Sequence, residues 1–152
     1  MVSPIPDGYT AVTPYLTLTD AAKAIDFYRR AFGAEELYRM VAPDGERVAH
    51  AELQIGNARL MLADSFPEWG SPPPARDGAG VGVHLYVKEV DAVMQAAEKA
   101  GARITMPAMD AFWGDRFGKL LDPYGVTWSV ATHMADLTPE QIAEGAKQAM
   151  GG

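Results

Sequence analysis

The alternation of apolar and polar residues predicts strands in four stretches of the first half of the chain. These stretches are residues 12–18, 35–41, 47–55 and 58–64, in which apolar side chains recur at every second position. From Asp20 to Phe32 the apolar spacing is helical, with Asp20 as the expected N-cap and Gly33 as the C′ residue. The Gly56-Asn57 pair is short enough for a tight hairpin between the last two strands. The first half therefore has the order strand, helix and three strands.

The second half of the chain repeats this order. Ala31-Phe32-Gly33-Ala34 aligns with Lys99-Ala100-Gly101-Ala102 at an offset of 68 residues (102 − 34). Carried forward, the offset places Leu60-Met61-Leu62 on Trp128-Ser129-Val130. The predicted elements are strands near residues 81–87, 103–109, 116–121 and 127–132, with a helix at 90–100. We therefore predict an α+β fold of two βαβββ modules, at about residues 10–65 and 81–135, whose curved mixed sheets surround a cavity.

Two further segments lie outside these modules. The stretch 66–80 contains Pro67, Pro72, Pro73 and Pro74, so it is predicted to be the linker between the modules. A C-terminal helix is predicted over residues 138–149, because Thr138-Pro139-Glu140-Gln141 offers Thr as N-cap, Pro at N1 and Gln at N3. This helix is rich in alanine and only weakly apolar, so we expect an appendage or an element that faces a partner.

Length and composition exclude several classes of protein. With 152 residues and 48% hydrophobic content, the chain suits one buried core, and we expect a single domain over residues 1–152. The absence of cysteine excludes disulfides and thiolate chemistry. The net charge of −7, without a basic cluster, argues against nucleic acid as a partner. No stretch approaches the roughly 18 apolar residues of a membrane span, and residues 1–8 lack a signal-peptide pattern, so we expect a cytoplasmic protein with no membrane partner.

The predicted strands place polar and aromatic side chains together on one face of each sheet. A two-residue turn at Gly56-Asn57 pairs Ile55 with Ala58 and hence Glu52 with Met61. In the first module the residues expected to face the cavity are Thr13, Tyr15, Thr17, His50, Glu52, Gln54, Arg59 and Met61. In the second they are Gly82, His84, Tyr86, Arg116, Gly118 and Ser129. Such a lining suits a bound small molecule better than a sealed core.

Several short motifs resemble those of a known family. They are Ile25-Asp26-Phe27-Tyr28 with Phe32-Gly33-Ala34, His50-Ala51-Glu52-Leu53, Trp113-Gly114-Asp115-Arg116-Phe117-Gly118 and Asp122-Pro123-Tyr124-Gly125. Over about residues 10–135 the chain resembles the vicinal oxygen chelate superfamily (glyoxalase, bleomycin resistance protein and dioxygenase), and most of all its PhnB-like branch. The resemblance implies paired βαβββ modules and a homodimer. It does not imply one reaction, because one fold hosts many chemistries.

The resemblance also allows a test for the metal site of that superfamily. Its metal-dependent enzymes take ligands from positions that correspond here to Thr13, Met61, Gly82 and Ser129. None of these is His, Glu or Gln, so we expect no metal at the usual site and no cofactor. A displaced site for Zn, Ni, Mn or Fe at His50, Glu52 and His84 is the alternative, and these three are the candidate catalytic residues. The competing interpretation is that they are hydrogen-bonded cavity or core residues.

Other residues are candidates for binding a ligand. Trp113 could stack on a planar ligand and Arg116 could pair with an anionic group, although both could instead shape the turn at the end of the sheet. Tyr15 and Tyr86 offer phenol groups or simple packing, and Met61 and Ser129 lie at matching cavity positions. Trp69 is a candidate lid or dimer contact. His133 is expected at the surface or in a dimer contact, and the Asp122-Pro123-Tyr124-Gly125 turn is assigned no chemistry.

Three functional hypotheses follow. The first is a metal-independent protein of the bleomycin-resistance type, which binds a small organic ligand in a dimeric cavity. The second is an enzyme of the lyase or dioxygenase type, either with a metal at His50, Glu52 and His84 or with Glu52 and a histidine as acid and base. The third is a structural member of the superfamily whose fold supports only assembly.

Overall fold

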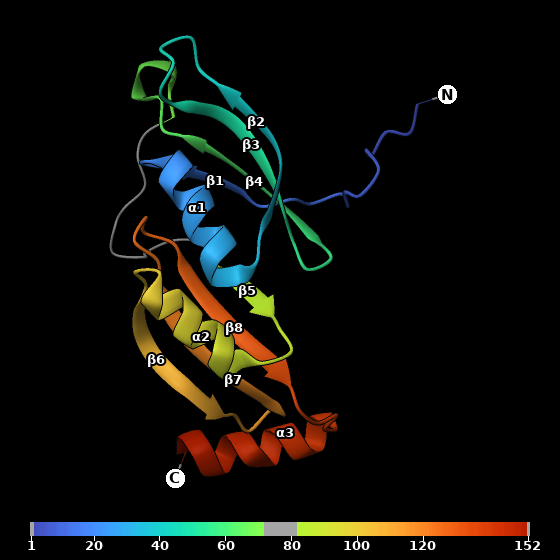
Figure 1. Cartoon of the computed structure of the whole chain (residues 1–152). Helices are drawn as coiled ribbons and strands as arrows, with labels where there is room; N and C mark the ends of the chain where they lie inside the picture. Colours follow the sequence, from blue (N-terminus) through green and yellow to red (C-terminus); the bar gives the residue numbers. More distant parts are fainter. Residues whose placement is uncertain (1, 72–81, 152) are drawn as a thin grey trace.

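The computed structural model describes residues 2–71 and 82–151 and arranges them as two modules with the same order of elements (Figure 1). The first module contains β1 (Tyr15–Leu18), α1 (Ala21–Phe32), β2 (Glu35–Val41), β3 (Val48–Ile55) and β4 (Ala58–Asp64). The second contains β5 (Gly82–Tyr86), α2 (Val90–Lys99), β6 (Arg103–Asp110), β7 (Asp115–Leu121) and β8 (Thr127–His133). The predicted repeat is confirmed. Residues 72–80 of the expected linker, and residue 81 at the expected start of a strand, lie outside the described residues.

Each module forms a four-stranded mixed sheet, with strand orders β1-β4-β3-β2 and β5-β8-β7-β6. The pairs β1–β4 and β5–β8 are parallel, and the other strand pairs are antiparallel. One helix covers each sheet, α1 and α2 contact each other, and the two sheets are not closed into a barrel (Figure 1). The fold is therefore α+β, as predicted. We call the face of each sheet that points away from its helix the open face.

The core continues from one module into the other through aromatic side chains. Tyr28 and Phe32 on α1 lie 5.3 and 4.4 Å from Trp128 of β8, measured between ring centroids. Trp128 and Tyr28 are almost fully buried, at 1% and 0% exposure. Burial of such large rings contributes strongly to stability, so the α1–β8 contact joins the two modules.

The Asp122-Pro123-Tyr124-Gly125 turn is stabilised by a buried carboxylate. Asp122 is 3% exposed and accepts hydrogen bonds from the Tyr28 hydroxyl at 2.7 Å and from the Trp128 indole at 2.9 Å. It also accepts from the backbone N–H groups of Tyr124 and Val126. The sequence interpretation assigned this turn no chemistry, and the structure gives it a structural role: it ties α1 of the first module to β8 of the second.

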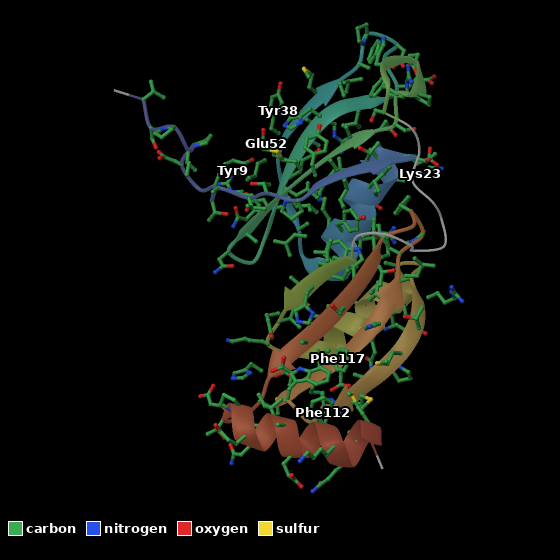
Figure 2. All side chains as sticks on the ribbon, turned by 180° about the vertical axis from the view of Figure 1, so that it is seen from behind. Tyr9, Lys23, Tyr38, Glu52, Phe112 and Phe117 are labelled. Atoms are coloured by element: carbon green, nitrogen blue, oxygen red, sulfur yellow. The ribbon has the colours of Figure 1, made fainter. Side chains whose placement is uncertain are left out.

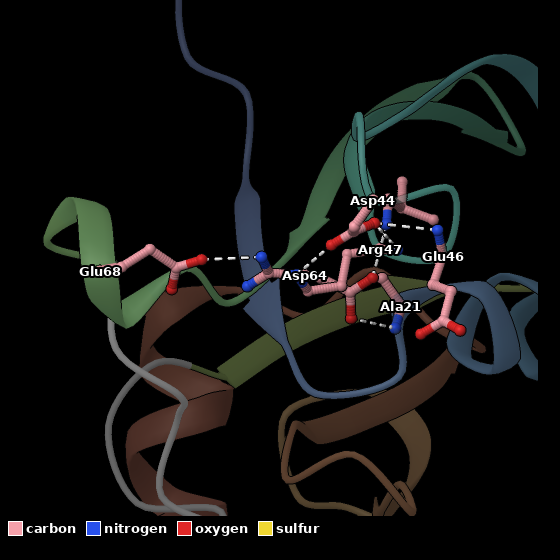
Figure 3. Close-up of polar contacts among 7 residues, drawn as sticks. Ala21, Asp44, Glu46, Arg47, Asp64 and Glu68 are labelled. Carbon is pink, nitrogen blue, oxygen red and sulfur yellow. Dashed lines mark hydrogen bonds and ion pairs between the residues drawn. The ribbon is translucent and has the colours of Figure 1, made fainter.

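The start of α1 differs from the prediction. Asp20 precedes the helix, but its side chain makes no capping bond and its φ is 61°. The cap comes from β4 instead: the Asp64 carboxylate accepts from Ala21 N at 2.9 Å and from Val48 N at 2.7 Å (Figure 3). Distant residues supply this cap, so the local N-cap rule correctly placed the helix start but named the wrong side chain.

The remaining elements lie close to their predicted ranges. β1 begins only at Tyr15, after Pro14, which lacks an N–H for the ladder. The capping box at Thr138 and Gln141 is confirmed, and it opens α3 (Pro139–Ala146), followed by a π-helical turn (Lys147–Gly151). This C-terminal segment crosses the end of the second sheet beside Phe112 (Figures 1 and 2). Within the described residues, the model contains no helix with the length and apolar character that a membrane crossing requires.

Candidate functional site

The open face of the first sheet carries a row of partly exposed side chains across all four strands. Strand pairing places Met61 of β4 between Tyr15 of β1 and Glu52 of β3. Glu52 in turn lies beside Tyr38 of β2. Leu53 points the other way and is fully buried under α1. The predicted division between a polar and an aliphatic face is therefore confirmed for β3 and β4.

Two side chains of this row, Tyr15 and Glu52, form a hydrogen-bonded chain with Tyr9 and His50. The Tyr9 hydroxyl donates to Glu52 Oε1, and Glu52 Oε2 lies 3.1 Å from His50 Nε2. The other ring nitrogen of His50, Nδ1, lies 2.9 Å from the Tyr15 hydroxyl. Figure 2 shows Tyr9 reaching from the N-terminal segment toward Glu52. Sequence reasoning missed Tyr9, because residues 2–11 have no periodic pattern from which its direction could be predicted.

These contacts hold Glu52 in its charged form. The hydrogen bond from Tyr9 lowers the pKa of Glu52, and His50 and Arg59 lower it further, against the opposite effect of partial burial. Burial and the Glu52 charge raise the pKa values of Tyr9 and Tyr15, which therefore stay protonated as donors. A general base works best with a pKa near the working pH. A carboxylate with a lowered pKa is better suited to accepting hydrogen bonds than to abstracting protons.

The open face of the second sheet has a different cluster, centred on Asp115. This carboxylate is 4% exposed and accepts from the Tyr86 hydroxyl at 3.0 Å and the Trp113 indole at 3.2 Å. His133 Nδ1 lies 2.8 Å from Asp115, and His133 Nε2 lies 2.7 Å from Asp136. The polar groups of the predicted ligand-binding residues Tyr86 and Trp113 are therefore already bonded to a buried carboxylate. No motif or spacing in the sequence indicated this partner for His133.

Electrostatics in this cluster favour charged groups. Burial alone would raise the pKa of Asp115, but the hydrogen bonds from His133, Tyr86 and Trp113 outweigh it and lower that pKa. The pKa of His133 is raised, chiefly by its bond to Asp136 and then by Asp115. The cluster therefore stabilises an ionised carboxylate beside a protonated imidazole.

His84, the third candidate catalytic residue, lies apart from the other two. It is on β5, where its Nδ1 is 2.5 Å from the Ser129 hydroxyl and its ring packs against Tyr86 with centroids 4.8 Å apart. His50 and Glu52 are together on the first sheet. In the part of the chain that the structure describes, no three His, Asp or Glu side chains are grouped so that they could hold a metal ion. A single chain does not assemble the displaced site.

The expectation that Arg116 and Gly118 face the cavity is wrong. Arg116 points to the helix side, where it pairs with Asp91 of α2 at 2.9 Å and with Asp110 at 3.2 Å. A Cβ on Gly118 would collide with Met94 of α2. The second module has a turn of three residues, 123–125, between Asp122 and Val126, whereas the first has two between Ile55 and Ala58. Because the second turn is one residue longer, each β7 side chain lies on the opposite face from the β3 residue with which the 68-residue offset aligns it.

Trp69 lies at the start of the expected linker, in the short helix η1 (Pro67–Trp69). Its ring is 70% exposed and stacks on Phe66, with centroids 4.8 Å apart. Arg47 covers Phe66 at 4.2 Å and pairs with Glu68 at 2.7 Å, which fixes η1 to the β2–β3 turn (Figure 3). Trp69 is thus an exposed aromatic side chain that is held beside Phe66 near the β2–β3 turn.

The junction cavity lies where the two modules meet. It has a volume of about 370 Å³ and is lined by residues of both modules, which are Gly8, Thr10, Val12, Thr13, Pro14, Ile55, Asn57, Ala58, Arg59, Leu60, Val83, His84, Leu85 and Trp128. Among these, Thr13, Arg59 and His84 were expected from the sequence to face a cavity, and His84 was also a candidate catalytic residue. The seven predicted ligand-binding residues lie elsewhere on the described surface, five of them on the open faces or at their end. A cavity between modules depends on how they pack together, and no single sequence motif encodes that packing.

Comparisons with known proteins agree with this architecture. The model of the glyoxalase/bleomycin resistance protein/dioxygenase superfamily matches residues 9–130. An uncharacterized protein of Mycobacterium tuberculosis H37Rv, Rv0887c, is 40% identical over 136 residues, which cover 87% of this chain and 79% of the relative. The chain belongs to the glyoxalase/bleomycin resistance protein/dioxygenase superfamily.

Solved structures of this superfamily and its PhnB-like branch share the fold. TioX from Micromonospora sp. ML1 superposes with a TM-score of 0.62 at 26% identity, covering 85% of this chain and 100% of TioX. The PhnB protein from Bacillus cereus superposes with a TM-score of 0.64 at 21% identity, covering 81% and 99%. The second likeness is one of fold alone.

The positions that hold a divalent metal in other members of the superfamily do not suit one here. They carry Thr13, Met61, Gly82 and Ser129. Met61 offers a thioether opposite Tyr15, Ser129 a hydroxyl engaged with His84, and Gly82 no side chain at all. Zinc, nickel, manganese and iron sites are built from imidazole and carboxylate donors. This donor set does not fit such a metal.

Proposed function

We propose that the protein is a homodimeric, metal-independent binding protein for a small organic ligand, of the bleomycin-resistance and glyoxalase-like type. The observation that carries the proposal is the exposure of aromatic rings on both open faces. Tyr15, Tyr38 and Tyr86 are 49%, 50% and 61% exposed. Aromatic side chains have a large apolar area, and contact with a ligand or another chain would remove that area from water.

The positioning of two of these rings favours binding over passive exposure. The Tyr15 hydroxyl is bonded to His50 and the Tyr86 hydroxyl to Asp115, so each ring has a preferred orientation before any ligand arrives. Preorganised rings lose less conformational entropy on binding. Tyr15 and Tyr86 would therefore stack on a planar ligand, with the charged Glu52 as a nearby hydrogen-bond acceptor.

Dimer formation would place such a ligand between two open faces. Each described sheet ends in two edge strands, β1 and β2 in the first and β5 and β6 in the second. Unpaired edges and exposed aromatic rings are usually covered by another chain. Pairing of modules between two chains would cover both features and enclose the ligand.

Two measurements test this proposal together. Sedimentation velocity at micromolar concentration should give the mass of a dimer. A thermal-shift screen of planar organic compounds should find ligands that raise the melting temperature of the wild-type protein but not that of Tyr86→Ala. The same ligands should still stabilise Tyr124→Phe, because the ring at position 124 does not lie on an open face. The proposal would be contradicted if the protein were a monomer and if no compound stabilised the two variants differently.

An enzyme is the second candidate function, and the Tyr9–Glu52–His50 chain favours it. These side chains could move a proton at a bound substrate, with a divalent metal recruited if a partner chain brought His84 close. Glu52→Gln keeps the shape of the side chain but removes its charge. In an enzyme we expect it to lower rate or metal affinity about 100-fold at an unchanged melting temperature.

Metal analysis separates the two candidates. Under the binding-protein proposal, protein purified without an affinity tag holds no stoichiometric Zn, Ni, Mn or Fe. Glu52→Gln and His84→Ala then change the melting temperature only modestly and leave ligand binding intact. Stoichiometric metal that is lost from both variants without a change in melting temperature would favour the enzyme.

A further inference from the structure

The junction cavity has the size and composition of a ligand site, and a single chain forms it. Its volume of about 370 Å³ falls in the range of small-molecule pockets, which begins at roughly 300 Å³. Neither a second chain nor an open-face tyrosine is needed to build it.

One wall of the cavity is apolar and comes from both modules. Ile55, Leu60 and Trp128 are core side chains that reach the cavity, and Val83 and Leu85 of β5 continue the wall. An apolar body placed there would be removed from water on several sides, which is the main source of affinity in such pockets.

The cavity also has polar lining residues, which carry positive charge without negative charge. Arg59 lines it together with Thr10, Thr13, Asn57 and His84, and none of the described lining residues is Asp or Glu. The whole chain has 20 acidic and 13 basic residues, so a surface without carboxylates runs against its composition. The potential inside this cavity therefore favours an anion.

Arg59 itself has unused bonding capacity. Among the described residues it makes no ion pair, and its Nε is buried without a hydrogen-bond partner. Glu52 is close enough for its charge to interact with Arg59, but its oxygens are bonded to Tyr9 and His50. A buried donor without a partner is destabilising, so an anionic ligand would satisfy a need that the protein leaves open.

The N-terminal segment holds the Arg59 guanidinium in place. The Tyr9 ring stacks on it, with the guanidinium carbon 5.0 Å from the ring centroid. Gly8 passes so close that any Cβ at this position would collide with the guanidinium. A fixed guanidinium can pair with a carboxylate or sulfonate through two parallel hydrogen bonds.

We propose that the junction cavity binds a small organic acid, with the anionic group on Arg59 and the apolar body against Leu60, Val83 and Trp128. Thr10, Thr13 and Asn57 supply further hydrogen-bonding groups beside the anion. This site is separate from the ligand site proposed on the open faces, because it requires only one chain and neither open-face tyrosine.

Two fluorescent probes that differ in one charge test the proposal. The first is 8-anilinonaphthalene-1-sulfonate, and the second is N-phenyl-1-naphthylamine, which has the same rings but no sulfonate. The full-length protein should bind the anionic probe at one site per chain. Arg59→Gln should weaken that binding about 10- to 100-fold, as expected for the loss of hydrogen bonds to a charged group. Binding of the uncharged probe should stay within about twofold of wild type, because Arg59 contributes little to a neutral ring.

Two further variants control for charge and for location. Arg30→Gln removes an exposed arginine of α1 that pairs with Asp26, and it should change neither affinity. Ala58→Trp puts a large ring at an exposed position on the cavity lining, and it should abolish binding of both probes. Melting curves establish that each variant is folded. The proposal is overturned if Arg59→Gln weakens both probes equally or neither, or if Ala58→Trp leaves anionic-probe binding unchanged.

Discussion

The two modules share a backbone plan but differ in the polar side chains on their open faces. Across the first sheet the row of paired residues is Tyr15, Met61, Glu52 and Tyr38. Across the second, the corresponding row is His84, Ser129, Lys119 and Met106. A carboxylate in the first module thus corresponds to an ammonium group in the second. The chemistry of the open face is not repeated with the fold.

On the helix side the modules are alike. Near the end of the last strand, Asp64 in the first module and Thr132 in the second accept a hydrogen bond from the first N–H of the helix of the same module, at 2.9 and 3.0 Å. Both copies must satisfy the N–H groups at a helix start, because the fold depends on them. The open faces are free of that requirement, so their differences point to function.

The strongest test of the comparison uses Asp122 and Ile55, which precede the last turn of their modules. Asp122→Ala would leave the buried donors of Tyr28 and Trp128 without a partner, each at about 1–3 kcal/mol, so we expect a loss of about 4 kcal/mol in unfolding free energy. Ile55→Ala removes only apolar contacts at the end of a sheet, and we expect a loss of about 2 kcal/mol. Urea denaturation followed by tryptophan fluorescence measures both.

Asp122→Asn is the matched control for this prediction. The amide keeps one acceptor oxygen and the shape of the side chain, so its loss should lie between wild type and Asp122→Ala. Equal losses for Asp122→Ala and Ile55→Ala would mean that Asp122 adds nothing beyond ordinary packing.

Substitutions at the two helix caps should have smaller effects on stability. Asp64→Ala removes an acceptor from two backbone donors, Ala21 N and Val48 N, and we expect it to destabilise the protein by about 2–3 kcal/mol. Thr132→Ala removes one backbone N–H bond, from Val90, and the hydroxyl bond to Val87 O; we expect about 1 kcal/mol. The same urea titrations measure both changes. A larger loss for Thr132→Ala would contradict the view that the charged cap in the first module is the stronger one.

The periodic patterns of the sequence were sufficient to predict the repeated fold. Alternation and helical spacing depend on local chain geometry, so they located every strand and both module helices in the described residues, and the Thr138 capping box marked the start of α3. They did not indicate the short helix η1, which lies in the expected linker. The face of Glu52 was also predictable, because a two-residue turn sets the register of β3 against β4. These features require knowledge of only a few neighbouring residues.

Features that depend on distant residues were not predictable in this way. The face of Arg116 was wrong because one additional turn residue shifted β7 against the internal repeat. Asp64 replaced Asp20 as the cap, and Asp115 became the partner of His133, through contacts that only the folded sheet creates. The site as a whole was therefore less predictable than the fold, because it is built where modules and strand ends meet.

The smallest expected effects are changes of stability with pH, and they have opposite signs on the two open faces. The pKa of Glu52 is lowered from 4.5, first by Tyr9. Its contribution to stability is therefore present above pH 4.5 and is lost as the pH falls through the lowered pKa. The pKa of His133 is raised from 6.5, first by Asp136. Its contribution is present below pH 6.5 and is lost as the pH rises through the raised pKa.

Two single substitutions should separate these effects. Tyr9→Phe should destabilise the protein above pH 4.5, and the difference from wild type should disappear in more acidic solution, where Glu52 is protonated in both. Asp136→Asn should move the NMR titration midpoint of the His133 imidazole down toward 6.5. Because Asp136 is fully exposed, added salt should reduce the shift in the wild-type protein as well. A His133 midpoint that is the same in wild type and Asp136→Asn at low salt would show that Asp115, and not Asp136, sets this pKa.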